Sequence, residues 1–557
     1  MTRTCKWLIG AAAVAMMAAA TPAVARLKPS PNDPALVYLQ ARAASMTGDH
    51  SRSATLMASL AEAQPGDSDI AKKALNEAIA AGRIDMALQL ARQVPQAQLP
   101  SDARLLLAVD ELRRKRADKA VTWLSGPADT GTLQFLNPLI NAWADADRGD
   151  SKKALETISQ IPPASLLGPL RFEQEAFILL KARNTADAQA FVDRALANSG
   201  SRESQLRLAF SDGFLAAGDQ ARALAVLDDL GTEAGPAKQR VQARKSSGQA
   251  IDTSAKAFSE VLTAFGADVA RIDRAPPPIG LIQVARYANP QNSGAAILLA
   301  LLFDGNGQAE QALSVLQSVG PNDALAPQVR DIQVRILIDE KRLNDAYAIA
   351  AAPGFGPNAT VGDLSRLGDV YEAMKRHDDA AGAYGKAVAL ARKQGLKEQV
   401  WPLLLLQASS LEEGKRWPEA RAALSQALEI APQQPLLLNF MGYAKLERGE
   451  DVDNAEAMIR KASELAPDDA SITDSLGWAQ FKRGKVADAI ATLQKAAEKD
   501  PDQAEIQEHL GDALFRSGRR YEARFAWEAS LVTAEDDIAS RVKAKLVTGL
   551  TPANAAP

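Results

Sequence analysis

The sequence contains almost no cysteine. Cys5 is the only cysteine in 557 residues, and it precedes the apolar run from Trp7 to Ala20. A lipoprotein cysteine lies just after such a run, so Cys5 is not a lipid-attachment site. Once the N-terminal segment is removed, the chain has no disulfide, no thiolate nucleophile and no cysteine metal ligand.

Aromatic residues and long apolar runs are also scarce. Aromatics make up 5% of the chain, apolar residues 47% and charged residues 24%. This composition favours closely packed helices over strands, and therefore an all-α fold. No later run approaches the length of a membrane-spanning helix, so we expect no transmembrane segment in the mature chain. The 68 acidic residues outnumber the 64 basic ones, so we expect no nucleic-acid partner.

The N-terminal residues have the pattern of a secretory signal. Arg3 and Lys6 precede the apolar run, and the small residues Ala23-Val24-Ala25 follow it. This order predicts a signal peptide over residues 1–25, cleaved after Ala25, and a linker over residues 26–33. The alternative is an uncleaved signal anchor.

A repeat of about 34 residues, which is the length of two helices and a turn, runs along the chain. Leu476-Gly477 recurs 34 residues later as Leu510-Gly511, and Pro467 recurs at the same interval as Pro501. Each block reads as two antiparallel helices, with small residues where the helices approach and glycine at the turn. Such hairpins bury their apolar faces only by stacking on their neighbours. Blocks begin near residues 34, 68, 101, 135, 169, 204, 293, 327, 361, 401, 435, 470 and 504.

Residues 232–292 interrupt the phase of the repeat. They contain a triple proline, 276–278, between two apolar helical stretches. We read this segment as one degenerate repeat with an insertion, either a bend between two arms or one long loop in a continuous superhelix. The predicted organisation is an N-terminal array (34–231), this interruption, a C-terminal array (293–533), a capping helix (534–549) and a loose tail (550–557).

The capping helix is predicted from a stripe of apolar residues. Ile538, Val542 and Leu546 recur every four residues, whereas Arg541, Lys543 and Lys545 are expected on the other faces. A helix of this kind can cover the last exposed repeat.

The blocks resemble the tetratricopeptide repeat (TPR). The match is clear in the block from Val361, which has Leu367-Gly368, Tyr371, Ala380 and Tyr384 at the positions of the family pattern. The C-terminal third is similar to long exported TPR proteins of Gram-negative bacteria, including the adaptor of a periplasmic carboxyl-terminal processing protease. The resemblance implies an all-α TPR solenoid that acts in the periplasm as a protein-binding scaffold, possible partners being a protease and its clients. Without a lipid-attachment cysteine, it is not expected to be a lipoprotein.

The resemblance also indicates where a partner would bind. In the TPR family, the first helix of each block lines a concave face. In three successive blocks the lining positions hold polar side chains beside aromatics, a combination suited to interfaces. We call this row the ladder; it could line a groove or pack between adjacent first helices. It comprises Asn439, Phe440, Tyr443, Asp474, Trp478, Phe481, Glu508, His509, Asp512 and Phe515.

Catalytic patterns are missing from the sequence. The three histidines, His50, His377 and His509, fall in separate blocks, and there is no HExxH, GxSxG or Walker pattern. We therefore predict no enzyme, no cofactor and no metal site. Two other functions remain open besides the scaffold: a structural component of an envelope export or assembly machine, and a peptidoglycan- or glycan-binding solenoid.

Overall fold

The computed structural model describes residues 33–125, 133–272 and 274–556. These residues form 30 α-helices, α2 to α31, with a few short 3-10 turns and no strand. The all-α solenoid is therefore confirmed. The expected signal peptide and residues 26–32 of the linker lie outside the described residues, as does Pro557 of the expected tail.

The chain divides into two compact units, one ending at Val329 and the other beginning at Arg330. The boundary falls within helix α19 (Ala326–Asp339). It differs from the expected division at residues 232–292, because the two helices after that segment, α17 (Ser293–Gly305) and α18 (Ala309–Gln317), belong to the first unit.

The first unit begins with six helix pairs that follow the predicted blocks closely. The sixth pair is extended by one further helix, α14 (Gly235–Gln242), which packs against both of its members. The pairs are α2 (Pro34–Met46) with α3 (His50–Ala63), α4 (Ser68–Ala80) with α5 (Ile84–Ala91), α6 (Ser101–Arg113) with α7 (Ala117–Leu124), α8 (Asn137–Asp147) with α9 (Ser151–Ser159), α10 (Arg171–Lys181) with α11 (Thr185–Ala197), and α12 (Glu203–Ala217) with α13 (Gln220–Ala225).

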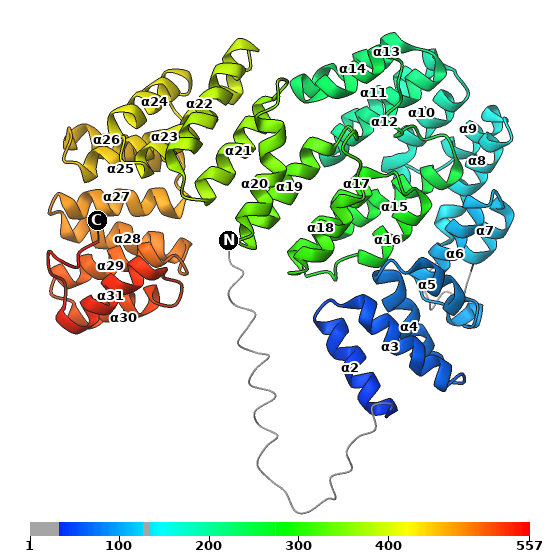
Figure 1. Ribbon diagram of the computed structural model, residues 1–557, viewed down its shortest axis with the longest axis horizontal. Coiled ribbons are helices and arrows are strands. Elements are labelled where there is room, and N and C mark those ends of the chain that lie inside the picture. Colours follow the sequence, from blue (N-terminus) through cyan, green and yellow to red (C-terminus); the bar gives the residue numbers. More distant parts are fainter. Residues whose placement is uncertain (1–32, 126–132, 273, 557) are drawn as a thin grey trace, which may run out of the picture. The chain divides into compact units, whose positions relative to one another are not determined.

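After α14, the interruption at 232–292 contains one helical hairpin, which packs against the second, third and fourth pairs of the unit. Helix α15 (Ser254–Ala270) packs against α6 and α8, and α16 (Ile279–Ala288) packs against α4 and α6. In Figure 1 these two helices lie inside the curve made by the earlier pairs. The first helices of the second, third and fourth pairs are therefore covered by the chain itself.

Specific contacts fix this returning hairpin. The Tyr287 hydroxyl donates to Asp110 Oδ1 at 2.9 Å, and Gln283 Nε2 donates to the Ala80 carbonyl at 3.2 Å. Gly280 allows α16 to approach closely, since a Cβ there would lie 2.3 Å from Asp102 Oδ2 and 3.5 Å from Ile79 Cγ2. The interruption is thus a packed element of the first unit.

The second unit continues with further helix pairs and a single last helix. Helix α19, which spans the boundary, is followed by α20 (Leu343–Gly354). The rest are α21 (Val361–Ala373) with α22 (His377–Lys393), α23 (Lys397–Glu413) with α24 (Trp417–Ile430), α25 (Pro435–Glu447) with α26 (Val452–Leu465), α27 (Ala470–Lys482) with α28 (Val486–Lys499), α29 (Ala504–Arg516) with α30 (Arg520–Ser530), and then α31 (Asp536–Thr548).

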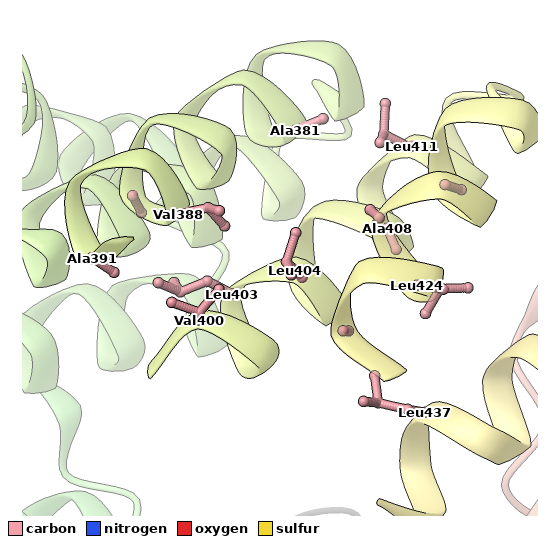
Figure 2. Close-up of a cluster of buried hydrophobic side chains, with 14 of the residues drawn as sticks. Ala381, Val388, Ala391, Val400, Leu403, Leu404, Ala408, Leu411, Leu424 and Leu437 are labelled. Carbon is pink, nitrogen blue, oxygen red and sulfur yellow. The ribbon is translucent and has the colours of Figure 1, made fainter. Parts of the chain in front are cut away.

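The core of this unit runs continuously from one pair to the next. Figure 2 shows buried side chains of α22, α23, α24 and α25 joined in one apolar cluster. Small residues set the spacing inside a pair, as expected from the repeat: a Cβ at Gly477 would lie 2.6 Å from Leu493 Cγ, and one at Gly511 would lie 2.3 Å from Trp527 Cδ1. Close helix contact at these positions requires glycine.

The end of the chain is more ordered than the sequence suggested. Helix α31 packs against α29 and α30, as expected of a cap. Residues 550–556, expected to be a loose tail, fold back instead. The Asn554 side chain is buried, accepts from the Thr551 amide at 2.6 Å and donates to the Gly549 carbonyl at 2.9 Å. The Ala556 amide donates to Asp512 Oδ2.

Candidate partner-binding surface

The ladder residues lie on α25, α27 and α29, the first helices of three successive pairs. The structure brings them together along one row, but it does not expose all of them. Five are buried between helices, with exposed fractions of 5% or less: Asp474, Trp478, Glu508, His509 and Asp512. At these five positions the structure shows packed side chains instead of an open groove. Asp474, Trp478 and His509 pack between adjacent first helices, and side chains of α31 contact Glu508 and Asp512.

An aromatic stack occupies the space between α27 and α29. The His509 ring lies on the Trp478 ring, with centroids 4.0 Å apart and planes 10° from parallel, and Phe481 stacks against the same tryptophan at 4.8 Å. His509 Nδ1 is 2.8 Å from Asp474 Oδ2. Burial lowers the pKa of His509, but the adjacent Asp474 carboxylate outweighs it and leaves that pKa above its ordinary value. These contacts join neighbouring repeats.

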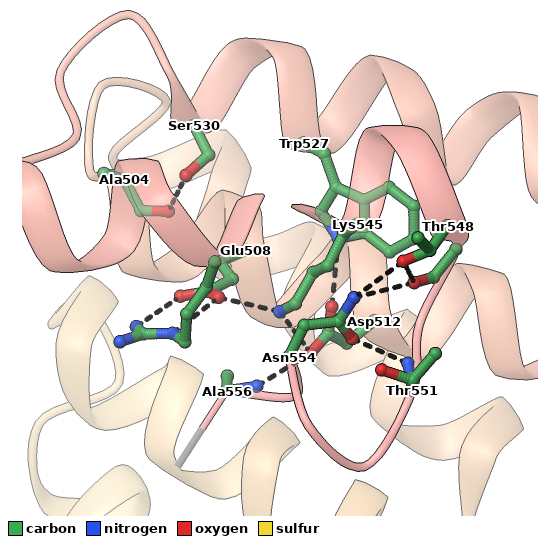
Figure 3. A network of polar contacts seen from close by, with 12 residues as sticks. Ala504, Glu508, Asp512, Trp527, Ser530, Lys545, Thr548, Thr551, Asn554 and Ala556 are labelled. Atoms are coloured by element: carbon green, nitrogen blue, oxygen red, sulfur yellow. Dashed lines mark hydrogen bonds and ion pairs between the residues drawn. The ribbon is translucent and has the colours of Figure 1, made fainter. Parts of the chain in front are cut away.

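The last two ladder carboxylates are held by helix α31. Lys545 Nζ lies 2.7 Å from both Glu508 Oε1 and Asp512 Oδ2, and Arg541 Nη2 lies 2.8 Å from Glu508 Oε2. Trp527 Nε1 donates to Asp512 Oδ1 at 2.9 Å. Figure 3 shows this network, in which the lysine extends between the two carboxylates.

The pKa values of the two carboxyls move in opposite directions. Burial raises the pKa of Glu508, but hydrogen bonds from Arg541 and Lys545 outweigh it and hold that pKa below its usual range. Burial dominates at Asp512 and raises its pKa, although Lys545 opposes the shift. Lys545, expected on an outer face of the capping helix, is fully buried. Glu508 and Asp512 could have indicated in the sequence that Lys545 is buried, because buried carboxylates require a counter-ion.

The accessible part of the row lies nearer its start. Asn439, Phe440 and Tyr443 of α25 are partly exposed, as are Phe481 and Phe515 at the ends of α27 and α29. Two residues that the sequence reasoning missed extend this part. They are Leu406 of α23, 38% exposed, and Leu436 of α25, 49% exposed. They occupy the sixth and second positions of their blocks, which are lining positions too, so the same frame could have found them.

Metal-ligand clusters and membrane-spanning helices are both missing from the described residues. Within 33–125, 133–272 and 274–556, no group of three or more His, Cys, Asp or Glu side chains could hold a metal ion. Over the same residues, no helix has both the length and the apolar content needed to cross a membrane.

Helix pairs stacked one on the next, without strands among the described residues, define an all-α helical-repeat solenoid. Comparison with known families agrees: the family described as "TPR repeat" matches residues 477–518, and that described as "Tetratricopeptide repeat" matches residues 365–435. Residues 365–435 and 477–518 therefore contain tetratricopeptide repeats, and the fold of the described residues is a TPR solenoid. TPR repeats generally mediate contacts between proteins.

The three solved structures compared below are each 15% identical to the chain or less. No curated protein sequence matches the chain. The crystal structure of the APC/C hetero-tetramer Cut9-Hcn1 is 14% identical, with a TM-score of 0.37, over 93% of this chain and 97% of that one. Yeast Tom70 is 13% identical, with a TM-score of 0.31, over 92% and 96%. A tetratricopeptide repeat protein from Parabacteroides merdae is 15% identical, with a TM-score of 0.38, over 46% and 98%.

Proposed function

We propose that this chain is a non-catalytic scaffold or adaptor of the cell envelope, which binds partner proteins on the inner face of its second unit. The observation that carries the proposal is the exposed Leu436, on one side of α25 with the partly exposed Phe440 and Tyr443, together with the exposed Leu406 on the first helix of the preceding pair. Apolar and aromatic side chains next to hydrogen-bonding groups are the usual centre of a protein interface. In the first unit, the returning hairpin covers α4, α6 and α8 instead.

The envelope location rests on the N-terminal sequence. A basic start, an apolar run and a small-residue cleavage site support export, and the similarity of the C-terminal third to exported TPR proteins supports a periplasmic destination. A protease and its clients are the partners that this similarity suggests. Mass spectrometry of the protein purified from its own envelope tests the first step, since cleavage after Ala25 gives a chain that begins at Arg26.

A substitution on the inner face tests the binding surface. We expect Leu406→Glu combined with Leu436→Glu to reduce the recovery of crosslinked partners at least about tenfold, because two charges would enter an apolar contact. The matched control is Ile430→Glu, at the end of the second helix α24, where the side chain is 42% exposed. The same partners at the same yield from the double variant would contradict the proposal.

The composition of the recovered complex separates the scaffold from its main alternative. Several clients in variable amounts support an adaptor, whereas one fixed complex supports a component of an envelope machine. No observation favours the glycan-binding alternative: it depended on exposed aromatics, and Trp478, the largest aromatic of the ladder, is 1% exposed.

A further inference from the structure

The outward face of helix α30 carries an apolar stripe. Tyr521, Phe525 and Val532 are 84%, 71% and 80% exposed. Tyr521 and Phe525 are one helical turn apart on the same side of α30, and Val532 follows in the turn after the helix ends at Ser530. The opposite side packs into the unit through Ala523, Ala526 and Trp527. Exposed aromatic side chains in a row are unusual on a free surface and mark interaction sites.

The preceding repeat shows that the stripe is specific to the last pair. Thirty-four residues earlier, the equivalent positions on α28 hold Ala487, Ala491 and Glu498, all exposed. The two helices are otherwise alike, with alanines at the matching buried positions Ala489 and Ala523. The repeat fold therefore does not require aromatic side chains at these positions, so the packing of the repeat does not explain their presence.

The charges around the stripe are divided along its length. Arg519, Arg520 and Arg524 lie in the first half of α30 or at its start, and the only acid among them, Glu522, pairs with Arg519. Acidic residues follow in the second half of α30, in the loop after it and in the first turn of α31. They are Glu528, Glu535, Asp536 and Asp537, all exposed.

We propose that α30 is a self-association surface, on which a second copy of this chain docks in the antiparallel direction about a two-fold axis. Such an interface uses the same patch on both copies, so the patch must complement itself. An antiparallel pair places the basic first half of α30 in one copy against the acidic residues at the end of α30 and the start of α31 in the other. Tyr521 of one copy then meets Val532 of the other, with Phe525 near the axis. Antiparallel helices also oppose their dipoles favourably.

Helix α31 extends the surface at one side. Arg524 Nη1 donates to the Leu546 carbonyl at 2.7 Å, which joins the last turn of α31 to α30. The next residue, Val547, is 86% exposed and adds to the apolar area at this end of the unit. The surface depends on α30 and α31 alone, so its occupation is independent of partner binding at Leu406 and Leu436.

Sedimentation equilibrium of the chain from residue 26 onward tests the association. We expect a concentration-dependent dimer, and we expect Phe525→Glu to weaken it at least about tenfold, which corresponds to about 1.4 kcal/mol. The control is Ala491→Glu, which places the same charge at the equivalent position of α28. Unchanged thermal unfolding shows that each variant is folded. A chain that is monomeric at every concentration overturns the proposal, and so does a dimer that both variants affect equally.

A charge exchange tests the antiparallel direction. Arg520→Glu with Arg524→Glu reverses two of the three basic residues around the stripe, and Glu528→Arg with Glu535→Arg reverses two of the four acidic residues. We expect each double variant to be monomeric alone and a one-to-one mixture to form a heterodimer at the native affinity, because both halves are then complementary again. Failure to pair on mixing, while the native chain dimerises, overturns the antiparallel arrangement. If the native chain instead stays monomeric but binds anionic lipid vesicles through the stripe, the occupant is a membrane and the proposal is wrong.

Discussion

Single buried charges in this protein differ in how they are compensated. Lys545 has two carboxylates within hydrogen-bonding distance, so its charge is neutralised and the burial is tolerable. Glu260 of α15 is also buried, but it lies near a second carboxylate, Glu173, whose effect on the pKa of Glu260 is opposed by Arg202. Its oxygens accept from Gln205 at 3.0 Å and Asn292 at 2.8 Å. Burial, reinforced by Glu173, raises the pKa of Glu260 to about 7.

Removing the ammonium group of Lys545 should loosen the end of the second unit. Lys545→Met leaves Glu508 and Asp512 buried without that partner, and we expect a loss of about 3 kcal/mol in the stability of the α29–α31 region. Hydrogen exchange of peptides from α31 measures it. The control is Lys543→Met on the same helix, where the side chain is exposed. Equal exchange in the two variants would show that the buried pairs contribute nothing.

The raised pKa of Glu260 predicts a pH dependence of the first unit. The ordinary value is 4.5 and the value in the folded chain is about 7. Between these values the folded state binds more protons than the unfolded state, so stability is full below about pH 4.5 and falls as the pH rises to about 7. The shift corresponds to about 3 kcal/mol.

Urea unfolding of the first unit at several pH values tests this dependence. We expect Glu260→Gln to remove most of the decline between pH 5 and 8, because the amide cannot ionise. Glu156→Gln is the control, since Glu156 is exposed on α9 of the same unit. If the two variants and the native chain give parallel curves, Glu260 is not the titrating group.

At the scale of elements, the sequence predicted which helices form pairs more accurately than it predicted the residue at which each helix begins. The blocks near 361, 435, 470 and 504 coincide with the starts of α21, α25, α27 and α29. The largest difference is at α23, which begins at Lys397, whereas the block begins near 401. The repeat phase reports buried positions, and Lys397, Glu398 and Gln399 are exposed residues that only extend the first turn.

The turns inside the pairs offer a stabilising substitution. Gly484 and Gly518 have φ of +75° and +89° after α27 and α29, but Lys415 adopts φ of +61° at the equivalent turn after α23. A side chain in this left-handed region is strained, so we expect Lys415→Gly to raise the free energy of unfolding by about 1 kcal/mol. Gly484→Ala is the reciprocal change and should lower it by a similar amount. Urea unfolding of both variants is the measurement, and a destabilised Lys415→Gly would contradict the strain argument.

For the whole molecule, the stacking of each helix pair on the next could be predicted from the sequence. The return of α15 and α16 to the early pairs of the first unit could not. Pairing and stacking depend on residues within about one repeat, so a constant period reveals them. The return of α16 to the second and third pairs depends on contacts such as Gln283 with Ala80, which are 203 residues apart and have no periodic signature. The burial of five ladder residues could not be predicted for a related reason. Their positions on the first helices were predicted correctly, but the position of a residue within its repeat does not indicate which neighbouring helix covers its side chain.

The packing of α16 against the early helices of the first unit can be tested separately, at the point where α16 comes closest to α4 and α6. Gly280 leaves no room for a side chain beside Asp102 and Ile79. We expect Gly280→Val to push α16 away, lower the stability of the first unit by about 2 kcal/mol and increase hydrogen exchange in α4, α6 and α16 together. Gly235→Val is the control, because a Cβ there meets nothing within 4 Å. The helices of the second unit should exchange as in the native chain. Faster exchange confined to α16 would show that the hairpin covers α4 and α6 without stabilising them.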